Sequence, residues 1–136
     1  MDKITVIGAG AVGATCANVI AHKDVTKEVI LIDVKPGVAE GKALDIWQTS
    51  AINSFNTRVT GYTDDYEKTK DSGIIVITSG LPRKPGMSRD DLIKTNALII
   101  KDVAEKAMKH SPKAIIIMVN NRLGADIAAR HNQSKA

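Results

Sequence analysis

The sequence has few residues of the types that mark specialised classes of protein. Of its 136 residues only Cys16 is cysteine, so no disulfide can form within the chain. This favours a reducing compartment, and we expect the cytoplasm. No apolar run approaches the ~20 residues that cross a bilayer. The opening MDKITVIGAG passes from charged residues directly into an apolar run, unlike a signal peptide. We therefore expect no membrane partner.

Aromatic side chains and blocks of like charge are also scarce. Aromatics make up 3% of the chain, so the core must be aliphatic, and the net charge of +4 comes from basic residues scattered among acids. A nucleic-acid-binding surface typically shows a basic stripe with interleaved aromatics, and neither is present. We expect no nucleic-acid partner, and we predict no metal site. An apolar fraction of 43% and a charged fraction of 25% are ordinary for a globular domain.

Strand-like and helix-like segments alternate along the chain. We expect strands at residues 3–8, 28–33, 58–62, 73–80 and 114–119. We expect helices at 11–22, 38–50, 88–110 and 121–131, a polar turn or short helix at 64–70, and a frayed tail at 131–136. Nearly continuous apolar strands are typical of parallel sheets covered on both faces. The alternation predicts a single α/β domain over residues 1–136, with a doubly wound parallel sheet of about five strands and helices on both faces.

The first strand is followed at once by glycines. Gly8, Gly10 and Gly13 form G-x-G-x-x-G at the junction of a strand and a helix. Gly8 allows the tight turn, Gly10 leaves room for a pyrophosphate, and Gly13 lets the helix pack closely on the strand. The free N–H groups of the first helical turn, which begins at Ala11 and Val12, would face the phosphates.

An acidic residue supports this interpretation. Asp33 ends the second strand, 20 residues after Gly13. A carboxylate there can accept hydrogen bonds from a ribose diol, and it would repel a 2′-phosphate. The pattern predicts a Rossmann-type domain that binds NAD rather than NADP. The alternative is a tight turn with an acid nearby by chance.

The segment GLPRKPGMSRDDL joins the fourth strand to the long helix at the same edge of the sheet. Arg83 and Arg89 lie on it, stiffened by Pro82 and Pro85. Arginine is suited to two-point capture of carboxylates, and ligands of open α/β sheets bind at this edge. On these residues alone, a solvated basic loop is an equal alternative.

Six stretches together resemble NAD-dependent malate dehydrogenases of the lactate dehydrogenase-like branch, enzymes of the tricarboxylic acid cycle. They are ITVIGAGAVGAT, VILIDV, GKALDI, VITSGLPRKPGMSRDDL, TNA and IIIMVNN. The match runs from Lys3 to about Asn121. The resemblance implies an oxidoreductase that interconverts malate and oxaloacetate with NAD, bound at the glycine turn and Asp33.

The resemblance also implies roles for the loop and for residues beyond it. Arg83 would grip the far carboxylate of a dicarboxylate substrate, and Arg89 would polarise the substrate carbonyl as the catalytic electrophile. Gly80, Asn96 and Asn121 would lie near the cofactor, and Asn121 would also contact the substrate. A structural cap is the alternative for Asn121.

Members of this family continue with a second, catalytic domain that supplies a histidine, its aspartate partner and a third arginine. No residue here matches them: His22 and His110 are expected at helix ends, and His131 lies in an unmatched tail. The sequence also departs from the family after VNN, where Arg122 replaces an expected proline. We therefore expect an NAD-binding domain with little or no turnover, whose dicarboxylate substrate would bind only with a catalytic domain.

Two alternatives stay open. One is a non-enzymatic nucleotide-binding module, natural or engineered, with an inherited arginine loop. The other is a self-assembling fragment, because the GKALDIWQ helix lies at a subunit interface in the family. Trp47 could anchor such a homo-oligomer, or it could simply pack in the core.

Overall fold

A computed structural model describes residues 1–78, 86, 88–119 and 132–133, and of Arg89, Leu92 and Ile93 it describes the backbone alone. The strands are β1 (Lys3–Ile7), β2 (Glu28–Asp33), β3 (Arg58–Thr63), β4 (Ile74–Ile77) and β5 (Ile115–Met118). The helices are α1 (Ala11–Lys23), α2 (Val38–Gln48), α3 (Ser50–Asn53), the 3₁₀ helix η1 (Tyr66–Thr69) and α4 (Arg89–His110).

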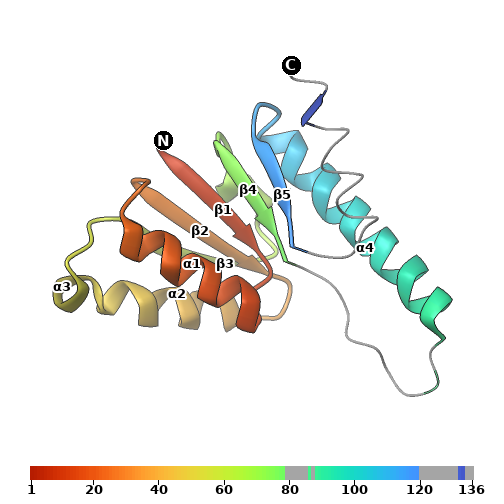
Figure 1. Ribbon diagram of the computed structural model, residues 1–136, viewed down its shortest axis with the longest axis horizontal. Coiled ribbons are helices and arrows are strands. Elements are labelled where there is room, and N and C mark those ends of the chain that lie inside the picture. The colour runs from red at the N-terminus through yellow and green to blue at the C-terminus, as the bar shows by residue number, and fades with distance from the viewer. Residues whose placement is uncertain (79–85, 87, 120–131, 134–136) are drawn as a thin grey trace.

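The five strands form one sheet in the order β3-β2-β1-β4-β5, and every neighbouring pair is parallel (Figure 1). The chain begins in the middle of the sheet, moves outward through β2 and β3, and then returns to β4 on the other side of β1. Crossovers on the two sides of β1 therefore run over opposite faces. The predicted Rossmann-type fold is confirmed.

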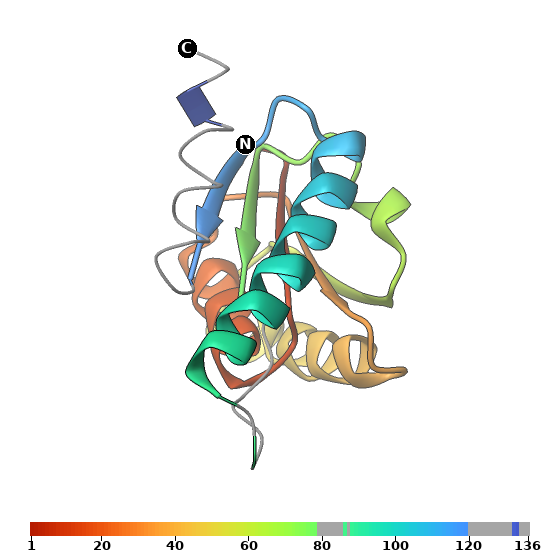
Figure 2. The same ribbon diagram turned by 90° about the vertical axis from the view of Figure 1, so that its right-hand side faces the viewer.

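Alternate residues of the central strands enter two separate cores. On β2, Val29 and Leu31 join the core under α1 and α2, whereas Ile30 and Ile32 join the core under α4 and η1. Figure 2 shows α4 lying along one face of the sheet, away from α1 and α2. Both faces of β2 are covered, which explains its nearly continuous apolar sequence.

The region after α2 differs from the prediction of one helix over residues 38–50. The helix α2 ends at Gln48, and the short helix α3 follows at Ser50–Asn53. The Thr49 hydroxyl donates to the Ile46 carbonyl oxygen at 2.7 Å, which satisfies an acceptor at the end of α2. Ser54 then ends α3 in a left-handed conformation with φ 56°. Apolar spacing alone carried no signal for this break.

The strand β5 lies at an edge of the sheet. Its Ile116 N–H donates to Asn132 Oδ1 at 3.1 Å, and Asn132 Nδ2 donates to the Ile116 carbonyl oxygen at 3.0 Å. One side-chain amide thus takes both bonds that another strand would make. Asn132 is held in place, although it belongs to a tail predicted to fray. The helix predicted at 121–131 lies outside the described residues.

A buried hydroxyl network ties η1 to the sheet and to the end of α4. Ser72 Oγ donates to the Thr69 carbonyl oxygen at 2.5 Å, and Thr5 Oγ1 lies 2.6 Å from Ser72 Oγ. Because the Ser72 proton is used, Thr5 is the donor of that second pair. Ser111 Oγ also donates to the Thr69 carbonyl oxygen, at 2.7 Å. The network fixes η1, whose first residue, Tyr66, faces the candidate site.

Candidate functional site

The register of the sheet places the end of β1 between the ends of β2 and β4. Ile7 pairs with Ile32 on one side and with Ile77 on the other. The next residue of each strand, Gly8, Asp33 or Thr78, therefore lies at the carboxyl edge. This is the point where the crossovers diverge, and open α/β sheets bind ligands there.

The glycine turn has no room for side chains at one of its glycines and open space at another. A Cβ atom on Gly13 would lie 1.6 Å from the Gly8 carbonyl oxygen, so α1 packs against the end of β1 only because Gly13 lacks one. Gly8 has φ 102°, a conformation that favours glycine. A Cβ atom on Gly10 would meet nothing within 4 Å. The open space at Gly10 leaves its backbone accessible to a ligand.

The helix α1 begins at this turn without a side-chain cap. Its N-cap, Gly10, has extended backbone and makes no capping hydrogen bond, and the first turn holds no acidic residue. The first N–H groups of a helix have no partner within the helix, and the helix dipole adds partial positive charge there. Ala11 and Val12 are exposed at this end. The start of α1 thus suits an anionic ligand such as a phosphate.

Asp33 lies beside the turn, half-buried. Its Oδ2 accepts a hydrogen bond from the Ala9 N–H at 2.7 Å, and its Oδ1 accepts one from the Lys35 N–H at 2.9 Å. The carboxylate is therefore held in a fixed orientation at the mouth of the crevice. Its two remaining lone-pair directions are available to hydroxyl groups of a ligand.

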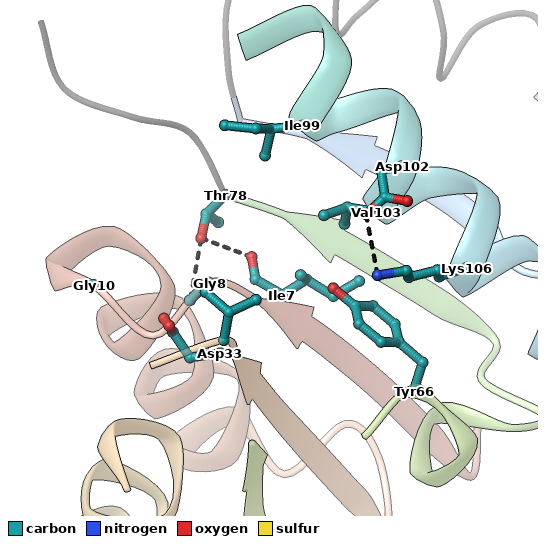
Figure 3. A pocket seen from close by; sticks show the side chains of 11 residues that line it. Ile7, Gly8, Gly10, Asp33, Tyr66, Thr78, Ile99, Asp102, Val103 and Lys106 are labelled. Carbon is teal, nitrogen blue, oxygen red and sulfur yellow. Dashed lines mark hydrogen bonds and ion pairs between the residues drawn. The ribbon is translucent and has the colours of Figure 1, made fainter. Parts of the chain in front are cut away.

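A cavity of about 500 Å³ lies over this edge. Figure 3 shows Asp33 and Gly8 on one side of it and Tyr66 and Lys106 on the other. The lining residues come from β1, β2, η1, β4 and α4 and the turns that follow the strands: Ile7, Gly8, Gly10, Asp33, Val34, Tyr66, Thr78, Ile99, Asp102, Val103 and Lys106. A flat apolar ring fits between these elements, while polar groups lie at the rim.

The far side of the cavity carries a tyrosine hydroxyl beside an ion pair. Burial, followed by the carboxylates of Asp64, Asp102 and Asp33, raises the pKa of Tyr66 to about 12. The phenol therefore stays protonated at neutral pH and can donate a hydrogen bond. Lys106 Nζ lies 3.1 Å from Asp102 Oδ2 and 5.5 Å from the centre of the Tyr66 ring. Together these contacts fix the wall opposite Asp33.

Only some of the predicted site residues lie in the described part of the chain. Gly80, Arg83 and Asn121 lie outside it. Arg89 is the first residue of α4, after the Ser88 cap, whose Oγ accepts from the Asp91 N–H at 3.1 Å as predicted. Asn96 is half-buried on α4, one turn before Ile99, which lines the cavity.

Sequence reasoning missed the α4 and η1 side of the cavity. Tyr66, Ile99, Asp102 and Lys106 lie on segments interpreted simply as a polar turn and an amphipathic helix. Their spacing on α4, at 99, 102, 103 and 106, marks one helix face. Nothing in that pattern distinguishes a cavity wall from ordinary core packing. Thr78 gave no signal because it reads as part of an apolar strand.

Two searches of the described residues found no feature of other classes. No group of three or more His, Cys, Asp or Glu side chains in this part of the chain could hold a metal ion. Likewise, none of its helices combines the length and apolar character needed to span a bilayer. His22 and His110 lie in the last turns of α1 and α4, and the His22 ring packs 5.3 Å from the Phe55 ring.

Comparison with known proteins gives consistent matches. The malate dehydrogenase of Cytophaga hutchinsonii is 59% identical over 133 residues, which are 98% of this chain and 43% of that protein. That of Pelagibacter ubique is 52% identical over 95% of this chain and 40% of its own length. The chain thus spans about two fifths of the relatives it matches.

Solved structures agree. The malate dehydrogenase of Salinibacter ruber superposes with a TM-score of 0.85 at 45% identity, over 95% of this chain and 40% of that one. That of Archaeoglobus fulgidus, in complex with NADH, gives 0.86 at 37% identity, over 95% and 44%. Residues 2–136 match the family described as the lactate/malate dehydrogenase, NAD binding domain. The resemblance and the NAD prediction are confirmed: this chain belongs to the lactate/malate dehydrogenase family, of which it contains the NAD-binding domain.

Proposed function

We propose that this chain is the cofactor-binding part of a malate dehydrogenase and holds NAD across the glycine turn, with the pyrophosphate at Gly10 and the start of α1. The adenosine ribose lies at Asp33. One observation carries the proposal: the capless start of α1 and the oriented Asp33 carboxylate line the same open crevice. A pyrophosphate and a ribose diol of one dinucleotide need both.

The adenine ring fits the apolar side of the cavity. Ile99 and Val103 line it from α4, and Val34 lines it from the end of β2. The protonated Tyr66 hydroxyl supplies a donor at this end. These residues explain how the described half of the site holds the adenosine of NAD.

The arginine residues belong to the substrate half of the proposal. Arg83 is assigned to the far carboxylate of malate or oxaloacetate, Arg89 to the carbonyl, and Asn121 to both cofactor and substrate. These assignments rest on the sequence motif and on the names of the relatives. The rest of the relatives' length matches no residue of this chain. Without a general acid–base, turnover falls by about 10²–10⁴-fold, so this chain alone reduces little or no oxaloacetate.

The test is a titration with NADH, followed by its fluorescence, with an oxaloacetate-reduction assay on the same protein. A saturable change and turnover at least about 100-fold below that of a complete relative are expected. Asp33 would repel a 2′-phosphate, so NADPH should bind more weakly. A flat titration would contradict NAD binding, and rapid turnover would contradict the missing acid–base.

A matched pair of glycine variants locates the site. Gly10→Ala adds a methyl where the pyrophosphate approaches, whereas Gly41→Ala adds one on the exposed face of α2. Both positions are open and neither has positive φ, so both variants should fold. Gly10→Ala should weaken NADH binding by about tenfold or more, the effect of losing one charge-assisted hydrogen bond. Equal affinities in the two variants would place the ligand elsewhere.

Self-association is a second candidate, favoured by exposed apolar side chains. Leu44 on α2 and Ile52 on α3 are 53% and 84% exposed. Trp47 instead packs partly buried against the core, so it has a packing role. Light scattering over a range of concentrations tests this candidate: a strict monomer at high concentration contradicts it.

A further inference from the structure

The Asp33 carboxylate makes hydrogen bonds that a ribose-binding role does not require. Its Oδ2 lies 2.7 Å from the Ala9 nitrogen, in the middle of the glycine turn, and its Oδ1 lies 2.9 Å from the Lys35 nitrogen. A carboxylate has two oxygens and about four acceptor directions. Two are taken by the protein itself, which leaves two for a ribose diol. Asp33 thus contacts the ligand and the phosphate-binding turn at once.

The turn is held from its other side as well. The Gly8 N–H donates to the Ile32 carbonyl oxygen at 2.8 Å. The single Thr78 hydroxyl proton is shared between the carbonyl oxygens of Ile7 at 3.0 Å and Gly8 at 3.2 Å. Ala9 has no bond of this kind except the one to Asp33 among the bonds described here, and its methyl is fully buried in the core.

Loss of the Asp33 carboxylate would therefore leave the Ala9 N–H without an acceptor at a position closed to water. A buried donor without a partner is costly, so the backbone would shift to find one. Gly10 and the first N–H groups of α1 follow Ala9 directly. Any such shift moves the groups that face the pyrophosphate.

From this geometry we infer that Asp33 is a positioning residue for the glycine turn, in addition to its role at the ribose. The inference builds on the proposed function and adds a second role to the same carboxylate. It has a consequence for cofactor choice. Replacing Asp33 to admit a 2′-phosphate also loosens the pyrophosphate site, so exchange of NAD for NADP costs affinity for both cofactors.

The first experiment measures the turn without any ligand. Amide hydrogen exchange of Ala9, followed by NMR, is compared in the wild type, Asp33→Ala, Asp33→Asn and Asp45→Ala. Asp45 is an exposed carboxylate on α2, so its variant controls for loss of charge. Asp33→Ala should speed Ala9 exchange by about tenfold, as expected for the loss of one bond to a charged group, and Asp45→Ala should not.

Asp33→Asn keeps one acceptor oxygen, but its amide group then meets a backbone N–H. It should raise Ala9 exchange by less than Asp33→Ala does. It also carries the test if Asp33→Ala does not fold. Unchanged Ala9 exchange in the folded variant would overturn the inference.

The second experiment separates the ribose from the phosphates by titrating ADP and 2′,3′-dideoxy-ADP. A role confined to the diol predicts that Asp33→Ala and wild type bind the dideoxy compound equally, and that result would overturn the inference. A positioning role predicts about tenfold weaker binding of the dideoxy compound by the variant. If wild type binds neither nucleotide, the proposed function fails, while Ala9 exchange still decides whether Asp33 fixes the turn.

Discussion

At the scale of single residues, Asp24 connects α1 to the segment before β3. It follows α1 in a left-handed conformation with φ 53°, and its Oδ1 accepts from the N–H groups of Asn56 at 3.0 Å and Thr57 at 2.9 Å. The Thr57 hydroxyl lies 2.9 Å from the same oxygen and 2.6 Å from the Thr26 carbonyl oxygen, so its one proton is shared. These bonds fix the connection on the far side from the cavity.

The hydrogen bonds of Asp24 predict a pH dependence of stability. The bond from the Thr57 side chain, followed by that from the Asn56 N–H, lowers the pKa of Asp24 below its ordinary value. A depressed folded-state pKa stabilises the fold above the unfolded value, about 3.9, and that contribution is lost as pH falls through the folded-state value. The difference in unfolding free energy between wild type and Asp24→Asn should therefore be largest near neutral pH and shrink below about pH 4.

Urea unfolding at pH 7, 5 and 3 measures that difference. Thr57→Val removes the largest cause of the shift while leaving Asp24 in place, so its own pH dependence should be flatter than that of wild type. A wild-type minus Asp24→Asn difference that stays constant over this range would show that the hydrogen bonds do not depend on the charge.

At the scale of elements, the contact of α2 with β3 depends on a single missing side chain. A Cβ atom on Gly61 would lie 2.1 Å from the Ala39 carbonyl oxygen and 2.6 Å from the Glu40 nitrogen. The backbone of α2 therefore rests directly on the backbone of β3. Glu40 reaches over this contact and accepts from the Thr63 hydroxyl at 2.8 Å.

Gly61→Ala should push α2 away from the sheet. Overpacking of a core typically costs about 1–3 kcal/mol, and the backbone atoms here cannot rotate aside, so we expect the upper end of that range. Thermal or urea unfolding measures it.

The control makes the same chemical change at a position that is open. Gly41→Ala on α2 would meet nothing within 4 Å, and it should stabilise the helix by about 0.5–1 kcal/mol. Opposite signs for the two variants support the packing argument. A mild effect of Gly61→Ala would show that α2 can move without loss.

At the scale of the whole molecule, the cavity joins the two halves of the sheet. Its walls come from β1 and β2 on one side and from η1, β4 and α4 on the other. The unfolded chain cannot present these walls together. A ligand held there should therefore bind the folded state alone and stabilise it.

NADH at about 100 times its dissociation constant should add about 2.7 kcal/mol to the free energy of unfolding. For a chain of this size that corresponds to a rise in Tm on the order of 5–10 °C, measured by circular dichroism. Gly10→Ala should show a smaller rise at the same concentration. An equal rise in both proteins would mean that the stabilising site is not the glycine turn.

Sequence reasoning recovered the order of elements and half of the site. Local chemistry explains this success, because Gly8 needs positive φ, Gly13 tolerates no Cβ, and Ser88 caps α4 within a few residues. Strands of uniform apolar character predicted a sheet covered on both faces. The break after Gln48 was missed because a helix end fixed by one hydroxyl leaves apolar spacing nearly unchanged.

The sequence by itself determined the glycine turn, the acid after β2 and the parallel sheet, since each depends on residues near one another in the chain. Only the tertiary structure decided that Tyr66 and Lys106 face Asp33 across one cavity, and that the Asp33 carboxylate bonds to Ala9. Such contacts depend on strand register and on how α4 crosses the sheet. Those are set by packing of the whole chain, which no local pattern records.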